Sequence, residues 1–220
     1  MNEKADANSK KAIVEASMHL FARRGYHGTS VSQIAEATGL TKGALYWYFK
    51  GKEDLFLSVL DSIREKWRQT VMEKVERVPG MIEKLEQLFD ATSEMIAAEE
   101  HPYSMHLFLT AAGAQREIQE FEEAIRAAYS GYIGTVADII KAGQEEGEIR
   151  KGLDAESVAV GLIGCLEGIV LQARLHSPTT IAAAIAEMKR QFIGSLRITT
   201  VRPMRKPKSQ PLSADQMNLF

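Results

Sequence analysis

Several features that mark other classes of protein are scarce in this chain of 220 residues. It has one cysteine, Cys165, so no disulfide can form within the chain and a reducing compartment is expected. Only six prolines and ordinary apolar and charged fractions exclude collagen-like and wholly disordered classes. The longest apolar stretch, Val158 to Leu166, is too short to cross a bilayer. The polar N-terminus (MNEKADANSKK) lacks the apolar segment of a signal peptide. A cytoplasmic protein without membrane contact is therefore predicted.

The net charge of −2 conceals an uneven distribution along the chain. Residues 1–52 carry a net charge of +4, residues 53–200 carry −9, and residues 201–220 carry +3. A basic N-terminal block joined to an acidic body favours an N-terminal part that meets a polyanion. Modest charge imbalance is also common on solvated helices, so charge alone does not decide the function.

Apolar residues recur with helical spacing along most of the chain, and no convincing alternating strand pattern occurs. The sequence therefore predicts an all-α fold of about nine helices in two domains. We expect an N-terminal three-helix domain over 1–53, a helical bundle over 54–200 and a flexible basic tail over 201–220. The expected helices cover about residues 10–25, 31–37, 41–49, 53–71, 79–98, 103–114, 117–146, 154–175 and 178–196, with Ser30, Thr41 and Asp154 as N-caps and Pro79 in a first turn.

The segment SVSQIAEATGLTKGALYWYF has the skeleton of a helix-turn-helix, because two short helical patterns flank a glycine-containing turn. Ile34 and Ala35 are expected to face inward from the first helix, and Leu45 and Phe49 from the second. Gly39 lies in the turn, where a backbone conformation that a β-carbon would oppose is available to glycine. This segment is the most informative part of the sequence.

The outer face of the second short helix has the composition of a surface that contacts DNA. A helical turn of about 100° per residue puts Gly43, Ala44 and Trp47 opposite the core, with Tyr46 and Tyr48 on the flanks. The small residues allow close approach to the major groove, where apolar groups can contact a thymine methyl. The hydroxyls and the helix N-terminus can reach phosphate oxygens. The alternative is a helical hairpin whose aromatics pack on the second domain, and the basic charge and small residues together favour DNA.

The segment from about residue 9 to residue 57 resembles the DNA-binding domain of the TetR (tetracycline repressor) family of bacterial regulators. The resemblance is carried by Ala16, Leu20, Phe21, Gly25, Tyr26, Thr29, Ser30, Val31, Ile34, Ala35, Gly39, Leu40, Lys42, Gly43, Leu45, Tyr46, Tyr48, Phe49, Lys52 and Leu55. The family often has His at the position of Tyr48, whose hydroxyl can still donate to phosphate. The resemblance implies a sequence-specific transcriptional regulator with DNA contacts from Thr29, Ser30, Thr41, Lys42, Gly43, Ala44, Tyr46, Trp47, Tyr48 and Lys52.

The number and lengths of the later helices fit the C-terminal bundle of the same family. The resemblance implies a homodimer through the last two helices, about residues 154–196, and an operator with two-fold symmetry. Small residues at helical spacing in this region suit either a dimer seam or close packing within the chain. They are Gly161, Gly164, Cys165, Gly168 and Gln172.

A ligand cavity is expected among the middle helices. Apolar candidate linings and an acidic body favour a small hydrophobic or cationic effector. Each candidate, taken alone, is more typical of a core residue than of a pocket, although a buried His106 or Gln172 would need hydrogen-bond partners. The candidate ligand-binding residues are Trp67, Phe89, Met95, Tyr103, His106, Phe108, Tyr129 and Gln172.

The sequence carries no motif that points to an enzyme. It has no H-E-x-x-H or cysteine-pair metal motif and no glycine-rich phosphate loop, so no catalytic residue, metal or cofactor is expected. The predicted function is a homodimeric repressor that a small effector releases from its operator. The alternative is a DNA-bound protein-interaction adaptor without a small ligand, and a solvent-accessible cavity would favour the repressor.

The C-terminal pentapeptide resembles the Gln-x-x-Leu-Phe peptides that dock bacterial proteins on the replication sliding clamp. Gln216, Leu219 and Phe220 occupy the three defined positions. A motif this short also arises by chance, and a mobile solubilising tail is the alternative. A clamp contact is therefore a hypothesis about the tail alone.

Overall fold

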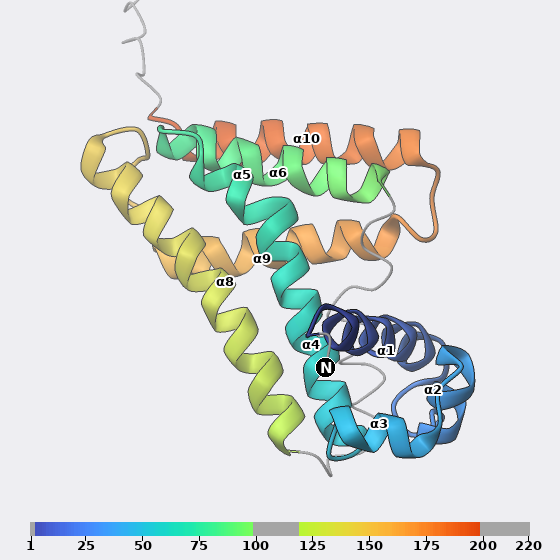
Figure 1. The fold of residues 1–220 in the computed structure, drawn as a ribbon. Helices are drawn as coiled ribbons and strands as arrows, with labels where there is room; N and C mark the ends of the chain where they lie inside the picture. The colour runs from blue at the N-terminus through green and yellow to red at the C-terminus, as the bar shows by residue number, and fades with distance from the viewer. Residues whose placement is uncertain (1–2, 99–118, 199–220) are drawn as a thin grey trace, which may run out of the picture.

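The computed structural model describes residues 3–98 and 119–198, and in these ranges the chain is built from helices (Figure 1). The predicted all-α fold is confirmed, because the β-type pairing described there is limited to one isolated bridge between Ile149 and Arg197. The helices are α1 (Glu3–Arg24), α2 (Val31–Thr38), α3 (Lys42–Tyr48), α4 (Lys52–Trp67), η1 (Arg68–Met72), α5 (Glu73–Glu76), α6 (Met81–Ala97), α8 (Gln119–Glu146), α9 (Ala155–Gln172) and α10 (Pro178–Leu196).

The two helices of the helix-turn-helix begin at side-chain caps that the sequence predicts. Ser30 caps α2 by accepting a hydrogen bond from the backbone N–H of Gln33, whose side chain accepts one from the backbone of Ser30 in return. Gly39 ends α2 with a φ of 67°, a left-handed conformation that favours glycine. Thr41 then caps α3 by accepting from Ala44 N–H at 3.2 Å. These contacts fix the turn between α2 and α3.

A first hydrophobic core holds α1 to α4 together and also includes the start of α8. The ring of Phe56 lies 5.1 Å from that of Phe21 and 4.5 Å from that of Phe121, so α1, α4 and α8 meet at one aromatic cluster. The buried set extends through α4 to Leu60 and along α8 to Ala128. The helix-turn-helix is therefore supported by residues on both sides of the expected domain boundary after residue 53, and that boundary stays a prediction.

Helices α4, η1 and α5 follow one another without a break from Lys52 to Glu76 and form one rod (Figure 1). The rod is longer than the predicted helix, which ends near Val71, and it contains a π-helical turn at Arg68–Met72. Its first half packs in the first core, and Val71, Met72 and Val75 pack in a second core. Counted as one helix, the rod brings the described residues to eight helices, close to the nine expected.

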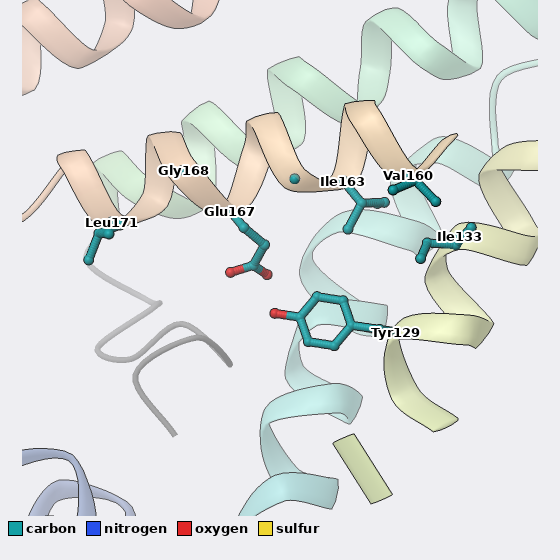
Figure 2. A pocket seen from close by; sticks show the side chains of 8 residues that line it. Tyr129, Ile133, Val160, Ile163, Glu167, Gly168 and Leu171 are labelled. Atoms are coloured by element: carbon teal, nitrogen blue, oxygen red, sulfur yellow. The ribbon is translucent and has the colours of Figure 1, made fainter. Parts of the chain in front are cut away.

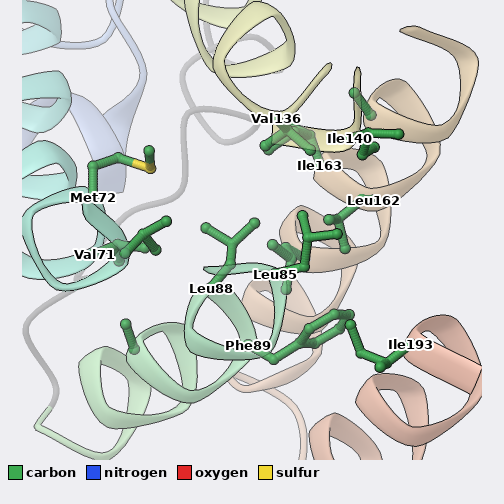
Figure 3. Close-up of a cluster of buried hydrophobic side chains, with 14 of the residues drawn as sticks. Val71, Met72, Leu85, Leu88, Phe89, Val136, Ile140, Leu162, Ile163 and Ile193 are labelled. Atoms are coloured by element: carbon green, nitrogen blue, oxygen red, sulfur yellow. The ribbon is translucent and has the colours of Figure 1, made fainter. Parts of the chain in front are cut away.

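The second core lies between the later part of the rod and α6, α8, α9 and α10. Figure 3 shows Leu85 and Phe89 of α6 facing Leu162 of α9 and Ile193 of α10. Helix α10 lies beside α6 (Figure 1), and the Lys189 ammonium forms an ion pair with Asp90 across them at 2.6 Å. These contacts leave one end of α9 and its outer face at the surface of the bundle.

Three predicted features of the later helices can be compared with the structure. Asp154 caps α9 by accepting from Ser157 N–H at 2.8 Å, as predicted. The expectation that Pro79 lies in a first helical turn is wrong, because Gly80 is the N-cap of α6 and the helix begins at Met81. The helix predicted at 103–114 and the tail at 201–220 lie outside the described residues.

Helix α9 is long and apolar enough to cross a membrane by composition alone, with a mean hydropathy of 1.5 over 18 residues. In the structure, however, it packs against α6, α8 and α10 and contributes buried residues from Ala155 to Val170 to the second core. One third of this apolar window is buried in the bundle, and its outer face includes Val160, which is 50% exposed.

Candidate DNA-contacting surface and ligand cavity

The side chains of α3 divide between the core and solvent as the helical wheel predicts. Leu45 and Phe49 are buried, whereas Trp47 is 61% exposed and Tyr46 is 56% exposed. Contact between water and the apolar surface of a large indole or phenol ring is unfavourable, so the exposure of these two rings points to a partner. Among the described atoms around it, a β-carbon added to Gly43 would approach only the hydroxyl of Thr41, at 3.8 Å, so this part of α3 is open to close approach.

The third aromatic residue of α3, Tyr48, is held from the side by α1. Its hydroxyl donates to Asp6 Oδ1 at 3.2 Å, and its ring meets the Trp47 ring edge to face at 4.7 Å. Both contacts restrict the rotamer of Tyr48 and support the indole beside it. The Tyr48 hydroxyl therefore has an internal partner that a phosphate would have to share or replace.

Thr29 and Ser30, both expected to contact DNA, have hydroxyls that form hydrogen bonds within the domain. Thr29 is 1% exposed. Its hydroxyl is positioned to donate to Leu20 O at 3.2 Å and to Gly25 O at 2.9 Å. Its hydroxyl therefore ties the α1–α2 connection to α1, and a DNA contact by this residue stays a prediction. The exposed Ser30 hydroxyl is engaged in the cap of α2.

The ammonium of Lys52 is also turned inward. It donates to Tyr26 O and Thr29 O, both at 3.1 Å, and lies 4.1 Å above the centroid of the Tyr26 ring. Partial burial lowers its pKa, partly offset by the nearby carboxylate of Glu53. Lys42, by contrast, is exposed at the first turn of α3. Of these two lysines, Lys42 is thus the one placed to reach a phosphate without breaking internal contacts.

A cavity of about 450 Å³ opens between α8 and α9 (Figure 2). Its size is within the range of small-molecule sites. Aliphatic side chains form most of its wall, and two polar groups, the phenol of Tyr129 and the carboxyl of Glu167, point toward one another across it. The cavity is lined by Tyr129, Ile133, Val160, Ile163, Gly164, Glu167, Gly168 and Leu171.

Glu167 is the most unusual polar residue of the cavity, and sequence reasoning missed it. The Tyr129 hydroxyl donates to its carboxylate, yet the buried Oε2 has no hydrogen-bond partner within the described ranges. Burial raises the pKa of this carboxyl to about 7, and the hydrogen bond from Tyr129 opposes the rise. The signal that could have identified it is an acidic residue that interrupts the apolar run of α9.

Comparison with known proteins agrees with both parts of this geometry. Residues 13–59 match the family described as bacterial regulatory proteins, tetR family, and residues 81–188 match the tetracyclin repressor-like C-terminal domain. The chain belongs to the TetR family. It is therefore a helix-turn-helix transcriptional regulator.

The individual relatives are regulators rather than enzymes. The chain is 26% identical to the fatty acid metabolism regulator protein of Bacillus subtilis (strain 168), over 72% of this chain and 79% of that protein. It is 28% identical to the regulator TtgR of Pseudomonas putida, over 76% and 81%.

Two solved structures share the fold. A TetR transcriptional regulator from Chloroflexus aurantiacus has a TM-score of 0.76 at 26% identity, over 89% of this chain and all of that one. AibR in complex with isovaleryl coenzyme A and operator DNA has a TM-score of 0.67 at 20% identity, over 83% and 97%. Nothing in these comparisons supports the sliding-clamp contact of the tail.

The residues expected to line a ligand pocket are dispersed in this TetR-family structure. Tyr129 lines the cavity, whereas Phe89 and Met95 are buried in the second core and Trp67 packs on Tyr132. The side chain of Gln172 is exposed, and its Oε1 lies 3.1 Å from Nε2 of His176, four residues later. Tyr103, His106 and Phe108 lie outside the described residues.

The small-residue stripe on α9 is divided in the structure: Cys165 packs against the second core, whereas the three glycines are exposed. Gly161, Gly164 and Gly168 are exposed, and a β-carbon added at any of them would meet no described atom within 4 Å. Close packing within the described part of the chain, one of the two open explanations, therefore accounts for Cys165 but not for the three glycines of the stripe. Two of its glycines, Gly164 and Gly168, also line the cavity.

Proposed function

We propose that this chain is a cytoplasmic, homodimeric repressor that binds a two-fold-symmetric operator through α3 and leaves it when a small hydrophobic or cationic effector binds the bundle. The observation that carries the proposal is the outer face of α3. Exposed Tyr46 and Trp47 stand beside Gly43, next to the cation of Lys42 at the helix start. Such a face suits base contacts flanked by phosphate contacts.

The proposed dimer uses α9 and α10. Its support is the exposed Gly161 of α9 together with two exposed apolar side chains on or beside these helices that do not line the cavity: Leu175 at 71% and Met188 at 37% exposure. Glycines allow two helix backbones to approach closely, and the apolar side chains would lose water contact on assembly. Two copies related by a two-fold axis would then present two α3 helices to successive major grooves.

The proposed effector response uses the rod α4–η1–α5 as the connection between the cavity side of the bundle and α3. The rod begins four residues after α3 ends and carries Trp67, whose ring lies 4.2 Å from that of Tyr132 on α8. The two tyrosines Tyr129 and Tyr132 are neighbours on α8, and one of them lines the cavity. A ligand that shifts α8 would therefore also move the rod through the contact between Trp67 and Tyr132.

The cavity also bears on the alternative of a DNA-bound adaptor, which needs no small ligand. A thermal-shift screen of metabolites and drugs, followed by binding to the DNA upstream of the gene that encodes this chain, tests the repressor. The expected effector raises the melting temperature and weakens operator binding by about 5- to 150-fold, and operator weakens effector binding by the same factor. Equal effector affinity with and without operator would contradict the proposed response and favour the adaptor.

A further inference from the structure

The cavity between α8 and α9 pairs a carboxylate with apolar walls. Glu167 presents Oε2 without a partner among the described residues, while the Tyr129 hydroxyl donates to the same carboxylate. Ile133, Ile163 and Leu171 form aliphatic wall around them (Figure 2). A buried carboxylate oxygen without a donor is costly and is compensated when a charged donor arrives.

We infer that Glu167 recognises the protonated nitrogen of an amine ligand whose apolar body fills this cavity. The inference rests on the proposed effector function and deepens it, since it names the chemical class of the effector. The ammonium would donate to Oε2, while Tyr129 holds the carboxylate from the other side. The aliphatic walls would take the hydrocarbon part of the ligand.

The charges acting on the site support a cation over an anion. Two phenols of α8 act on Glu167: Tyr129 donates to its carboxylate, and Tyr132 interacts with it electrostatically. Burial is the main reason that the pKa of Tyr132 is raised to about 12. Arg64 of the rod acts on Tyr132 but does not contribute to the environment of Glu167. Because no described cation neutralises Glu167, an anionic ligand would meet repulsion in a medium of low dielectric constant.

This arrangement does not suit a ligand such as isovaleryl coenzyme A, which is bound to AibR and carries several phosphate charges. An acyl-coenzyme A seated here would place its acyl group against a carboxylate that it cannot neutralise. An apolar amine, in contrast, satisfies the unpartnered oxygen and the aliphatic wall at once. The choice between these classes can be measured without DNA.

The test is isothermal titration calorimetry of the full-length protein with three probes that share one hydrocarbon body: phenylbutylamine, phenylbutanol and phenylbutyrate. We expect the amine to bind at least about tenfold more tightly than the alcohol and the carboxylate to bind most weakly. In Glu167→Gln, which keeps an acceptor for Tyr129, the preference for the amine should disappear. Glu156→Gln, on an exposed residue of the same helix, is the matched control and should keep it.

A second measurement needs no variant. The amine stays protonated near neutral pH, so its binding requires Glu167 to be ionised. With a pKa of about 7 for this carboxyl, the affinity should fall about tenfold when the pH is lowered from about 8 to about 6. The affinity for the alcohol should change much less over the same range.

Equal binding of the amine and the alcohol, a preference that survives in Glu167→Gln, or no amine binding at millimolar concentration would each overturn the inference. Operator release is measured separately and reports on the proposed function. If the amine binds through Glu167 but leaves operator affinity unchanged, the effector response fails and the recognition site stands. If the amine shows no preference that depends on Glu167 but another compound releases the operator, the amine site fails and the effector response stands.

Discussion

The indole of Trp67 and the phenol ring of Tyr132 lie with their centroids 4.2 Å apart and their planes inclined by 45°. This contact joins the rod that starts beside α3 to the helix that carries one wall of the cavity. A second tryptophan, Trp47, stands exposed on α3. The two tryptophans therefore differ in environment: Trp67 packs between helices, and Trp47 is exposed to solvent.

Trp67→Ala and Trp47→Ala should affect different properties. The first removes a half-buried ring from the α4–α8 contact and should lower the free energy of unfolding by about 2–4 kcal/mol. The second should change it by less than about 0.5 kcal/mol while weakening specific DNA binding. Urea unfolding at fixed protein concentration gives the first quantity, and fluorescence anisotropy of labelled DNA gives the second. Equal destabilisation by both substitutions would contradict the assigned positions.

Lys42 and Lys52 form a second matched pair. Lys42→Met should leave stability nearly unchanged but reduce the slope of log affinity against log salt by about one per half-site, because one phosphate contact is lost. Lys52→Met removes the donor to two backbone carbonyls and should lower the free energy of unfolding by about 1–2 kcal/mol. A salt titration of DNA binding and a urea titration separate the two effects. A reduced salt slope with unaltered stability in Lys52→Met would show that its ammonium serves DNA instead.

The carboxyl of Glu167 should make stability depend on pH in an unusual direction. Its pKa rises from an ordinary 4.5 to about 7 in the folded protein, so between these values the folded state holds a proton that the unfolded state has lost. The stabilisation is full below about pH 4.5, declines as the pH rises and is lost above about pH 7. The stability of Glu167→Gln relative to wild type should thus rise by about 3 kcal/mol from about pH 4 to about pH 8. Unfolding curves at several pH values measure it, and a constant difference would mean that the carboxyl is not buried.

The proposed dimer can be tested at a glycine that belongs to the stripe but not to the cavity wall. Gly161→Leu should shift the protein toward monomer and weaken operator binding, because a bulky side chain would separate two closely packed helices. Gly131→Leu, at an exposed and equally open position on α8, is the control and should stay dimeric. Light scattering after size-exclusion chromatography gives the mass. A wild-type monomer at micromolar concentration that still binds operator tightly would refute the dimer.

Local signals explain why much of the N-terminal domain was predictable. Ser30, Gly39 and Thr41 act through neighbours within three or four residues, so the sequence contains their whole capping interaction. Leu45 and Phe49 follow from helical spacing, which also exposes Trp47 on the opposite side. The contacts that decide these positions join residues that are close together in the sequence.

The features that sequence reasoning missed depend on contacts between distant residues. Lys52 turns inward because carbonyls 23 and 26 residues away accept from it, and Tyr48 is held by Asp6, 42 residues away. Glu167 meets Tyr129 only when α8 and α9 pack together. Helical spacing fixes which face a residue occupies but not which element it meets there. For the same reason helical spacing did not reveal that Gln172, a candidate pocket residue, is exposed.

The central claim is that the outer face of α3 recognises a specific DNA sequence. Its most direct test compares the binding of wild type and Trp47→Ala to the DNA upstream of the gene that encodes this chain and to a scrambled duplex of equal length, at one salt concentration. We expect wild type to prefer the upstream DNA by at least about 10³-fold. We expect Trp47→Ala to lose most of that preference while keeping its affinity for scrambled DNA. A preference that Trp47→Ala retains in full, or a wild type that binds both duplexes equally, would contradict the account.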